Sequence, residues 1–180
     1  MRHWTWELLE STVDVIGEMR KYNEGNFTAT ESCLGFVLPP SYRELMSRFG
    51  AGIWEPELMI ANPAFAKYPY SVLDPRTKRV RWIVEEYLKG GGKTPEFADQ
   101  LRRLIGIGGW GNNYDLCWDR GRIIGKEMEL CILTDRMEVI YCGRDLLEFL
   151  GTYWIDGKID EVCPFENASW SGRPVFRVLS

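Results

Sequence analysis

Two carboxylates lie four residues apart in a segment with a strand-like pattern. Asp115 and Asp119 belong to the run Tyr-Asp-Leu-Cys-Trp-Asp, and residues at i and i+4 of a strand lie on the same face of a sheet. A pair of carboxylates can act as general acid and base or hold a divalent cation. Most paired carboxylates of this kind are solvated surface groups. An enzyme that uses these two aspartates is therefore only the third functional hypothesis, after the two binding roles given below.

Histidine and cysteine chemistry has little support in the sequence. His3 is the only histidine, which argues against sites with several histidines and against His-activated nucleophiles. The five cysteines lack C-x-x-C spacing, and four have apolar or aromatic neighbours, so we expect reduced thiols in the core rather than ligands or nucleophiles. We therefore predict a protein without catalytic residues, metal or cofactor.

Two glycine-rich segments resemble phosphate-binding loops. Residues 106–111 (Gly-Ile-Gly-Gly-Trp-Gly) match G-x-G-x-x-G, but a dinucleotide site needs a strand before the motif and a helix after it. Here a helix is expected before it and a strand after it, which favours a glycine-rich turn between strands. Residues 92–94 (Gly-Lys-Thr) match the end of a P-loop, but Tyr87 replaces its first glycine. We expect neither segment to bind a nucleotide.

The length and charge of the chain argue against several classes of protein. The 180 residues include 22 basic and 26 acidic side chains, a formal net charge of −4, so a broad basic surface for nucleic acid is not expected. No apolar run approaches the roughly 20 residues of a membrane span, and acidic residues interrupt the N-terminus, unlike a signal peptide. We expect one cytoplasmic domain, residues 1–180, that contacts neither nucleic acid nor membrane.

Helical spacing dominates the first part of the chain. It extends over residues 4–22 and over 42–49, where either Pro40 takes the first helical position or Ser41 caps the helix. A capping box at residues 28–31 predicts a short turn that ends at Gly35. Asp74-Pro75 and Thr94-Pro95 predict two further helix starts. The basic residues of 76–81 are either an anion patch or, as we expect, a solvated helix start.

The apolar period changes after residue 104. Residues 114–119, 129–133 and 138–141 are typical of strands joined by short turns. A helix capped by Asp145 follows, and residues 174–179 predict an edge strand. Helices followed by a meander and a further helix indicate an α+β fold with an antiparallel sheet.

Residues 31–50 carry a family resemblance. The run Glu-Ser-Cys-Leu-Gly-Phe-Val-Leu-Pro-Pro-Ser-Tyr-Arg-Glu-Leu-Met-Ser-Arg-Phe-Gly resembles the opening signature of the SUKH superfamily. The glycine-rich segment that leads to Trp118 and Asp119 is similar to a second, more degenerate family pattern. The resemblance covers most of residues 28–153, with helix 4–22 and tail 157–180 as extensions. The chain departs from the family in having Phe-Gly for the usual Asn-Gly at 49–50, and in a longer, more helical segment over 56–104.

The resemblance implies both a fold and a function. SUKH domains pack helices against a curved antiparallel sheet. Most are immunity proteins that bind and neutralise a toxin, often a nuclease or deaminase, of a polymorphic toxin system. The first hypothesis is therefore a non-catalytic binder of such a toxin. The alternative is a regulatory or assembly adaptor of the cell-wall regulator type, without a toxin partner.

The glycine-rich turn and the strand after it are the predicted partner surface. Glycines flank Trp110 and leave its ring without neighbouring side chains, so we expect this ring to be exposed and Trp110→Ala to weaken partner binding without lowering the melting temperature. A buried Trp110 would give the reverse result. We expect Trp82, Trp118 and Trp154 in the core. The partner-binding candidates are Trp54, Trp110, Asn112, Asn113, Tyr114, Asp115 and Asp119.

Overall fold

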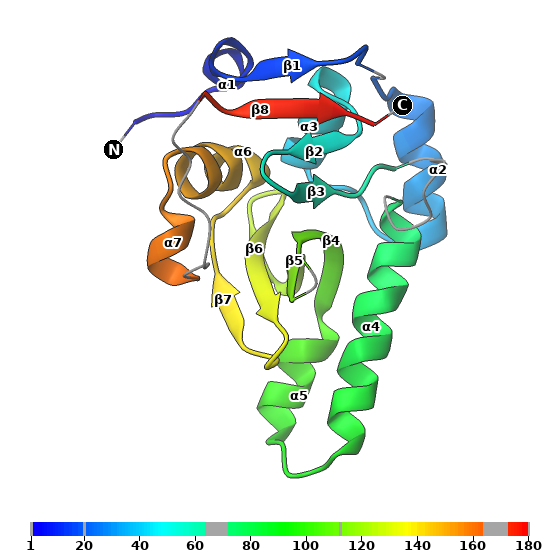
Figure 1. Cartoon of the computed structure of the whole chain (residues 1–180). Helices are drawn as coiled ribbons and strands as arrows, with labels where there is room; N and C mark the ends of the chain where they lie inside the picture. Colours follow the sequence, from blue (N-terminus) through cyan, green and yellow to red (C-terminus); the bar gives the residue numbers. More distant parts are fainter. Residues whose placement is uncertain (1, 20, 64–71, 112, 164–172, 180) are drawn as a thin grey trace.

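Eight strands form one open sheet in the computed structural model, which describes residues 2–19, 21–63, 72–111, 113–163 and 173–179 (Figure 1). Their order is β1-β8-β2-β3-β4-β5-β6-β7. All neighbouring strands are antiparallel except β1 and β8, which are parallel. The strands are β1 (Asp14–Ile16), β2 (Gly52–Trp54), β3 (Leu58–Ile60), β4 (Leu104–Trp110), β5 (Tyr114–Ile124), β6 (Glu127–Thr134), β7 (Val139–Tyr141) and β8 (Val175–Val178).

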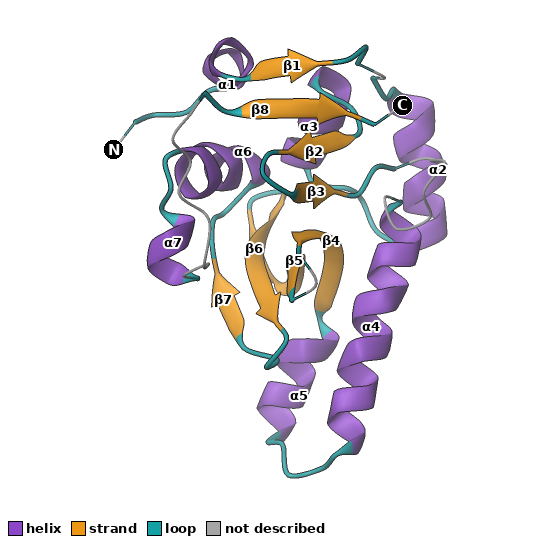
Figure 2. Ribbon diagram, in the orientation of Figure 1, coloured by secondary structure: helices purple, strands orange, loops and turns teal. Residues whose placement is uncertain are grey.

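Helices cover both faces of the sheet, which confirms the α+β fold (Figure 2). On one face, α4 and α5 pack against β5 and β6 around the buried Cys117 and Cys131. On the other face, α3 and the helical segment after residue 145 enclose a larger core around Trp118. The helices are α1 (Trp6–Thr12), α2 (Glu24–Leu34), α3 (Pro40–Arg48), α4 (Leu73–Lys89), α5 (Pro95–Arg102), α6 (Leu146–Glu148) with the π-helical η2 (Phe149–Ile155), and α7 (Ile159–Val162).

The glycines of residues 106–111 belong mainly to a strand, so the predicted turn is wrong over most of its length. Residues 104–110 form β4, and only the end of the motif turns toward β5. A side chain at Gly106 would meet Val80 of α4, and one at Gly108 would meet the Met59 carbonyl of β3. Glycine therefore allows close approach of a helix and a strand here. Strands β1, β8, β2 and β3 run across the view of Figure 2, whereas β4 to β7 run along it, so the sheet is curved between β3 and β4.

The N-terminal helix is shorter than its apolar pattern predicts. Helix α1 ends at Thr12, and Val13 is already extended. The next residues, Asp14–Ile16, form β1 alongside β8. Strand β8 therefore lies between β1 and β2, and the predicted edge position of residues 174–179 is wrong. The long sequence separation of β1 and β8 explains why neither local pattern revealed the pairing.

Several predicted helix ends are correct, whereas the predicted starts of α2 and α4 are wrong. Gly35 ends α2 with a φ of 74°, Thr94 caps α5 and Asp145 caps α6, as predicted. Pro40 takes the first position of α3, which decides between the two alternatives left open by the sequence. Helix α2 begins before the predicted turn, because Asn23 accepts hydrogen bonds from the Gly25 and Asn26 amides. Helix α4 begins at Leu73, so Asp74 lies in its first turn rather than at the predicted cap position, and α4 has no side-chain cap.

Leu45→Ala should lower the free energy of unfolding by about 2–5 kcal/mol. Leu45 lies on the buried face of α3 beside Tyr42, whose hydroxyl donates to the Ala61 carbonyl at 2.7 Å. Truncation leaves a cavity between the helix and the sheet. Denaturant melting measures the loss, and Val37→Ala is the exposed control. A loss below roughly 0.5 kcal/mol would contradict this placement of α3.

Candidate functional site

Asp119 is fully buried and forms the centre of an internal hydrogen-bond network. Its carboxylate accepts from Arg103 Nε at 3.2 Å, from the Tyr141 hydroxyl at 2.8 Å and from the Gly121 amide at 2.8 Å. Burial raises the pKa of Asp119, but these hydrogen bonds outweigh burial and leave the pKa lower than its ordinary value. The carboxylate therefore joins β5, β7 and the residue that follows α5, and it is not accessible to a partner, contrary to the prediction.

Asp115 is also buried, and its carboxylate forms ion pairs with two arginines of α4. It accepts from Arg76, which is itself largely buried, and from Arg79 Nη1 at 2.7 Å. Arg76 also donates to the Gly108 carbonyl of β4. The basic segment 76–81 is thus in part a structural contact rather than a solvated helix start. The two aspartates do share a face of the sheet, but α4 and α5 cover that face.

The predicted aromatic anchors are core residues. Trp110 is only 7% exposed, stacks on Tyr114 and meets Trp154 edge-on. Trp54 is 2% exposed and packs against Phe49 and Phe176. The prediction of an exposed Trp110 is wrong. Its glycine neighbours have no side chains to cover the ring, but Trp154 of η2 and Tyr114 of β5 pack against it.

The remaining predicted positions form only a small surface. Asn113 is exposed in the turn between β4 and β5, and Tyr114 is partly exposed. Asn112 lies outside the described residues. Trp118 and Trp154 are buried as predicted, whereas Trp82 is 64% exposed on α4. The structure therefore does not bring the six described candidates together on one accessible face.

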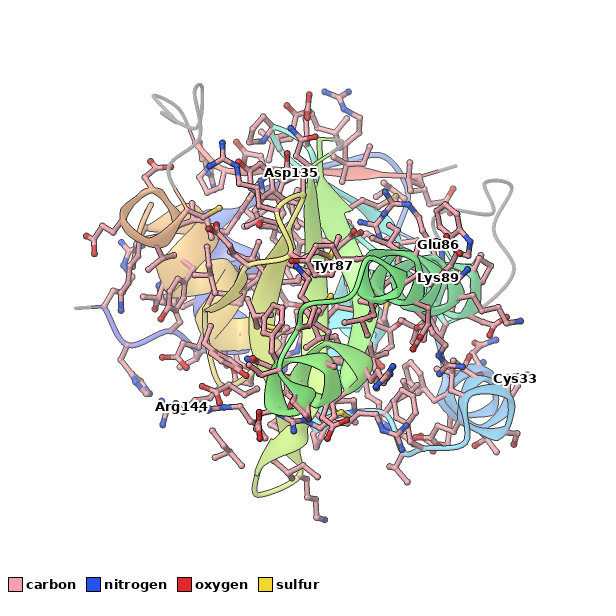
Figure 3. The ribbon with its side chains drawn as sticks, turned by 90° about the horizontal axis from the view of Figure 1, so that it is seen from below. Cys33, Glu86, Tyr87, Lys89, Asp135 and Arg144 are labelled. Atoms are coloured by element: carbon pink, nitrogen blue, oxygen red, sulfur yellow. The ribbon has the colours of Figure 1, made fainter. Side chains whose placement is uncertain are left out.

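The glycine-rich loop at residues 90–94 is a connection between helices. Thr94 caps α5 through the Phe97 amide, and the Lys93 ammonium lies 4.1 Å from the centre of the Tyr87 ring. Figure 3 shows Tyr87 on this helix pair. Lys93 and Thr94 are the residues that would contact the phosphates in a P-loop, and here both make contacts within the helix pair.

Four of the five cysteines are buried thiols. Burial raises the pKa of Cys117, Cys131 and Cys142 well above the ordinary value, and that of Cys163 to a smaller extent. These thiols stay protonated at neutral pH, as expected for core residues. Cys33 is exposed on α2 (Figure 3). Within the described ranges no three His, Cys, Asp or Glu side chains gather in a metal-binding arrangement.

A groove opens where α1, α3, α6 and the start of β6 meet. Glu127 of β6 accepts from the Ser41 amide at 2.8 Å and from the Ser41 hydroxyl at 2.7 Å, so its carboxylate caps α3. The Ser41 oxygen in turn accepts from the Leu146 amide at 3.2 Å. Asp145 accepts from the Glu148 amide and caps α6. Three elements far apart in the sequence are thus held together at this point.

We call this hollow the Trp6 groove, with a volume of about 360 Å³. It is lined by Trp6, Pro40, Ser41, Glu44, Glu127, Asp145 and Leu147. An adjoining hollow of about 470 Å³ shares Trp6, Asp145 and Leu147 and extends to His3 and Arg144. Figure 3 shows Arg144 at the periphery of the molecule.

The Trp6 groove is negatively charged. Of its three carboxylates, only Glu44 has an ion-pair partner, Arg48, within the described residues. Burial and, to a smaller extent, the charge of Asp145 raise the pKa of Glu127 above its ordinary value, against the hydrogen bonds from Ser41. A cation that entered the groove would meet Glu127 and Asp145, which form no ion pair within the described residues, although the charge of Asp145 also acts on the adjacent Arg144. The partly buried side chains of Trp6 and Leu147 provide apolar surface beside these carboxylates.

Sequence reasoning assigned no residue of this groove to a functional site. Its lining comes from residues 6, 40–44, 127 and 145–147, which are neighbours only after the sheet has formed. Asp145 was correctly identified as a cap. The capping role of Glu127 toward α3 depends on a tertiary contact that has no local signature.

No helix in the described part of the chain is long and apolar enough to cross a membrane. The sequence matches no known protein-family description and no curated protein.

Proposed function

We propose that the protein is a non-catalytic immunity protein that neutralises a basic toxin domain through the Trp6 groove. The observation that carries the proposal is the groove itself, which combines an aromatic ring with three carboxylates, of which Glu127 and Asp145 form no ion pair among the described residues. Buried aromatic anchors beside charges of one sign are typical of interfaces with a protein of opposite charge. The resemblance to the SUKH superfamily supplies the class of partner.

The state of the other reactive groups also supports a binding role. Asp115 and Asp119 are used in internal ion pairs, and four thiols are buried. The net charge of −4 favours encounter with a basic protein. The proposal thus moves the predicted interface from the strand after Trp110 to the opposite face of the sheet, while retaining the predicted kind of partner.

Trp6→Ala should weaken binding of the toxin partner by about tenfold or more. The partner is first identified by co-purification from the native host, and its affinity is then measured by calorimetric titration. Because Trp6 is partly buried, a thermal melt must show that the variant is folded. Glu44→Lys, a charge reversal on the surface of α3, is a second variant that should also weaken binding.

Trp82→Ala is the matched control, because Trp82 is exposed on α4 and lies outside the groove. Its affinity should equal that of the unaltered protein. Equal affinity of Trp6→Ala, Glu44→Lys and the unaltered protein would remove the groove from the interface. A partner without toxin activity would instead support the regulatory adaptor.

A further inference from the structure

The hairpin between β5 and β6 carries an exposed apolar tip. All residues from Arg120 to Lys126 are exposed, and we call this segment the hairpin tip. Ile123 is 64% and Ile124 is 46% exposed. Figure 3 shows the hairpin extending beyond the body of the molecule at the lower edge of the view. Two adjacent isoleucines in water at the end of a projecting hairpin indicate a contact surface rather than part of the core.

The hairpin tip is also positively charged. Arg122 pairs with Glu129. Arg120 lies 5.8 Å from the centre of the Phe36 ring. Across the described ranges, neither Arg120 nor Lys126 forms an ion pair with a carboxylate. An apolar tip with two such cations fits a concave, apolar surface of negative charge.

The Trp6 groove has these properties and lies next to the tip in the chain. Lys126 ends the tip, and Glu127, the following residue, is part of the groove. The isoleucines remain exposed, so a chain does not fill its own groove. When two complementary surfaces lie side by side on one molecule, a two-fold axis can place each surface of one copy against the complementary surface of the other, so that the same contact forms twice.

We propose that the protein forms a two-fold dimer in which the hairpin tip of each copy enters the Trp6 groove of the other. Ile123 and Ile124 pack against Trp6 and Leu147, and Lys126 lies near the acidic residues. Each contact occurs twice, which closes the assembly at two copies. Because the dimer fills both grooves, dimer formation and binding of a toxin partner exclude each other.

A charge exchange between two variants tests this arrangement on the protein alone. Sedimentation velocity should give a species of twice the 20.9 kDa chain mass for the unaltered protein at micromolar concentration. Lys126→Glu and Glu44→Lys should each weaken the dimer about tenfold or more, since like charges then meet at both contacts. An equimolar mixture of the two should recover the dimer, because opposite charges face each other at both contacts.

Ile123→Asp should also give a monomer, whereas Trp82→Glu, at an exposed apolar residue of α4, should leave the dimer intact. A monomeric unaltered protein would overturn the inference, and so would a dimer that Ile123→Asp leaves unchanged. A mixture that stays monomeric would overturn the pairing of tip with groove. None of these results depends on a toxin partner, so the proposed function would stand or fall separately.

Discussion

Trp110→Ala should lower the free energy of unfolding by about 3–5 kcal/mol. Trp110 lies under η2 and β5, with its ring centre 5.5 Å from that of Tyr114 and 5.4 Å from that of Trp154. Removal of the indole leaves a cavity beside Tyr114 and Trp154 and removes both ring contacts. Partner affinity of the folded fraction should not change, because the ring is not accessible.

Denaturant melting and calorimetric titration distinguish this expectation from an exposed anchor. Asn113→Ala, in the exposed turn that follows, is the control and should change stability by less than about 0.5 kcal/mol. A Trp110→Ala variant with unchanged stability and weakened partner binding would contradict the buried position of the ring. That result would return the interface to the β4–β5 turn.

Asp115→Ala should cost about 3–5 kcal/mol of stability, because it leaves a buried cation without its partner. Burial lowers the pKa of Arg76, an effect that the charge of Asp115 opposes. Without Asp115, Arg76 retains the Gly108 carbonyl but loses its carboxylate. Urea melting of Asp115→Ala, Arg76→Ala and the double variant should show the two losses to be less than additive.

An exposed ion pair of the same helix provides the comparison. Asp74 accepts from Lys78 at 2.7 Å, and Asp74→Ala should cost less than about 1 kcal/mol. A loss for Asp115→Ala as small as that for Asp74→Ala would mean that Asp115 is solvated. In that case the aspartate pair would again be a candidate for partner binding or catalysis.

Local physics predicted most elements of this fold. Glycine and proline positions, together with side-chain caps, correctly located the C-terminal end of α2 and the starts of α5 and α6, and limited the start of α3 to two alternatives. Two-residue alternation located β5 and β6, including the shared face of Asp115 and Asp119. The errors arose where a residue's neighbours are distant in sequence. The pairing of β1 with β8 and the glycine-mediated contact of α4 with β4 are the clearest examples.

The candidate site was far less predictable than the fold. Alternation placed two aspartates on one face, but it could not show that α4 and α5 cover that face. Flanking glycines suggested an exposed Trp110, although the ring is covered by Trp154, a residue 44 positions later in the sequence. The Trp6 groove depends on four segments that only tertiary packing brings together.

The toxin activity of the partner, titrated with this protein, is the most direct measurement of the central claim. We predict that activity falls to background at a one-to-one ratio of protein to toxin, and that Trp6→Ala requires about tenfold more protein for the same effect. Trp82→Ala should behave as the unaltered protein does. Toxin activity that an excess of folded protein leaves unchanged would contradict neutralisation by this chain.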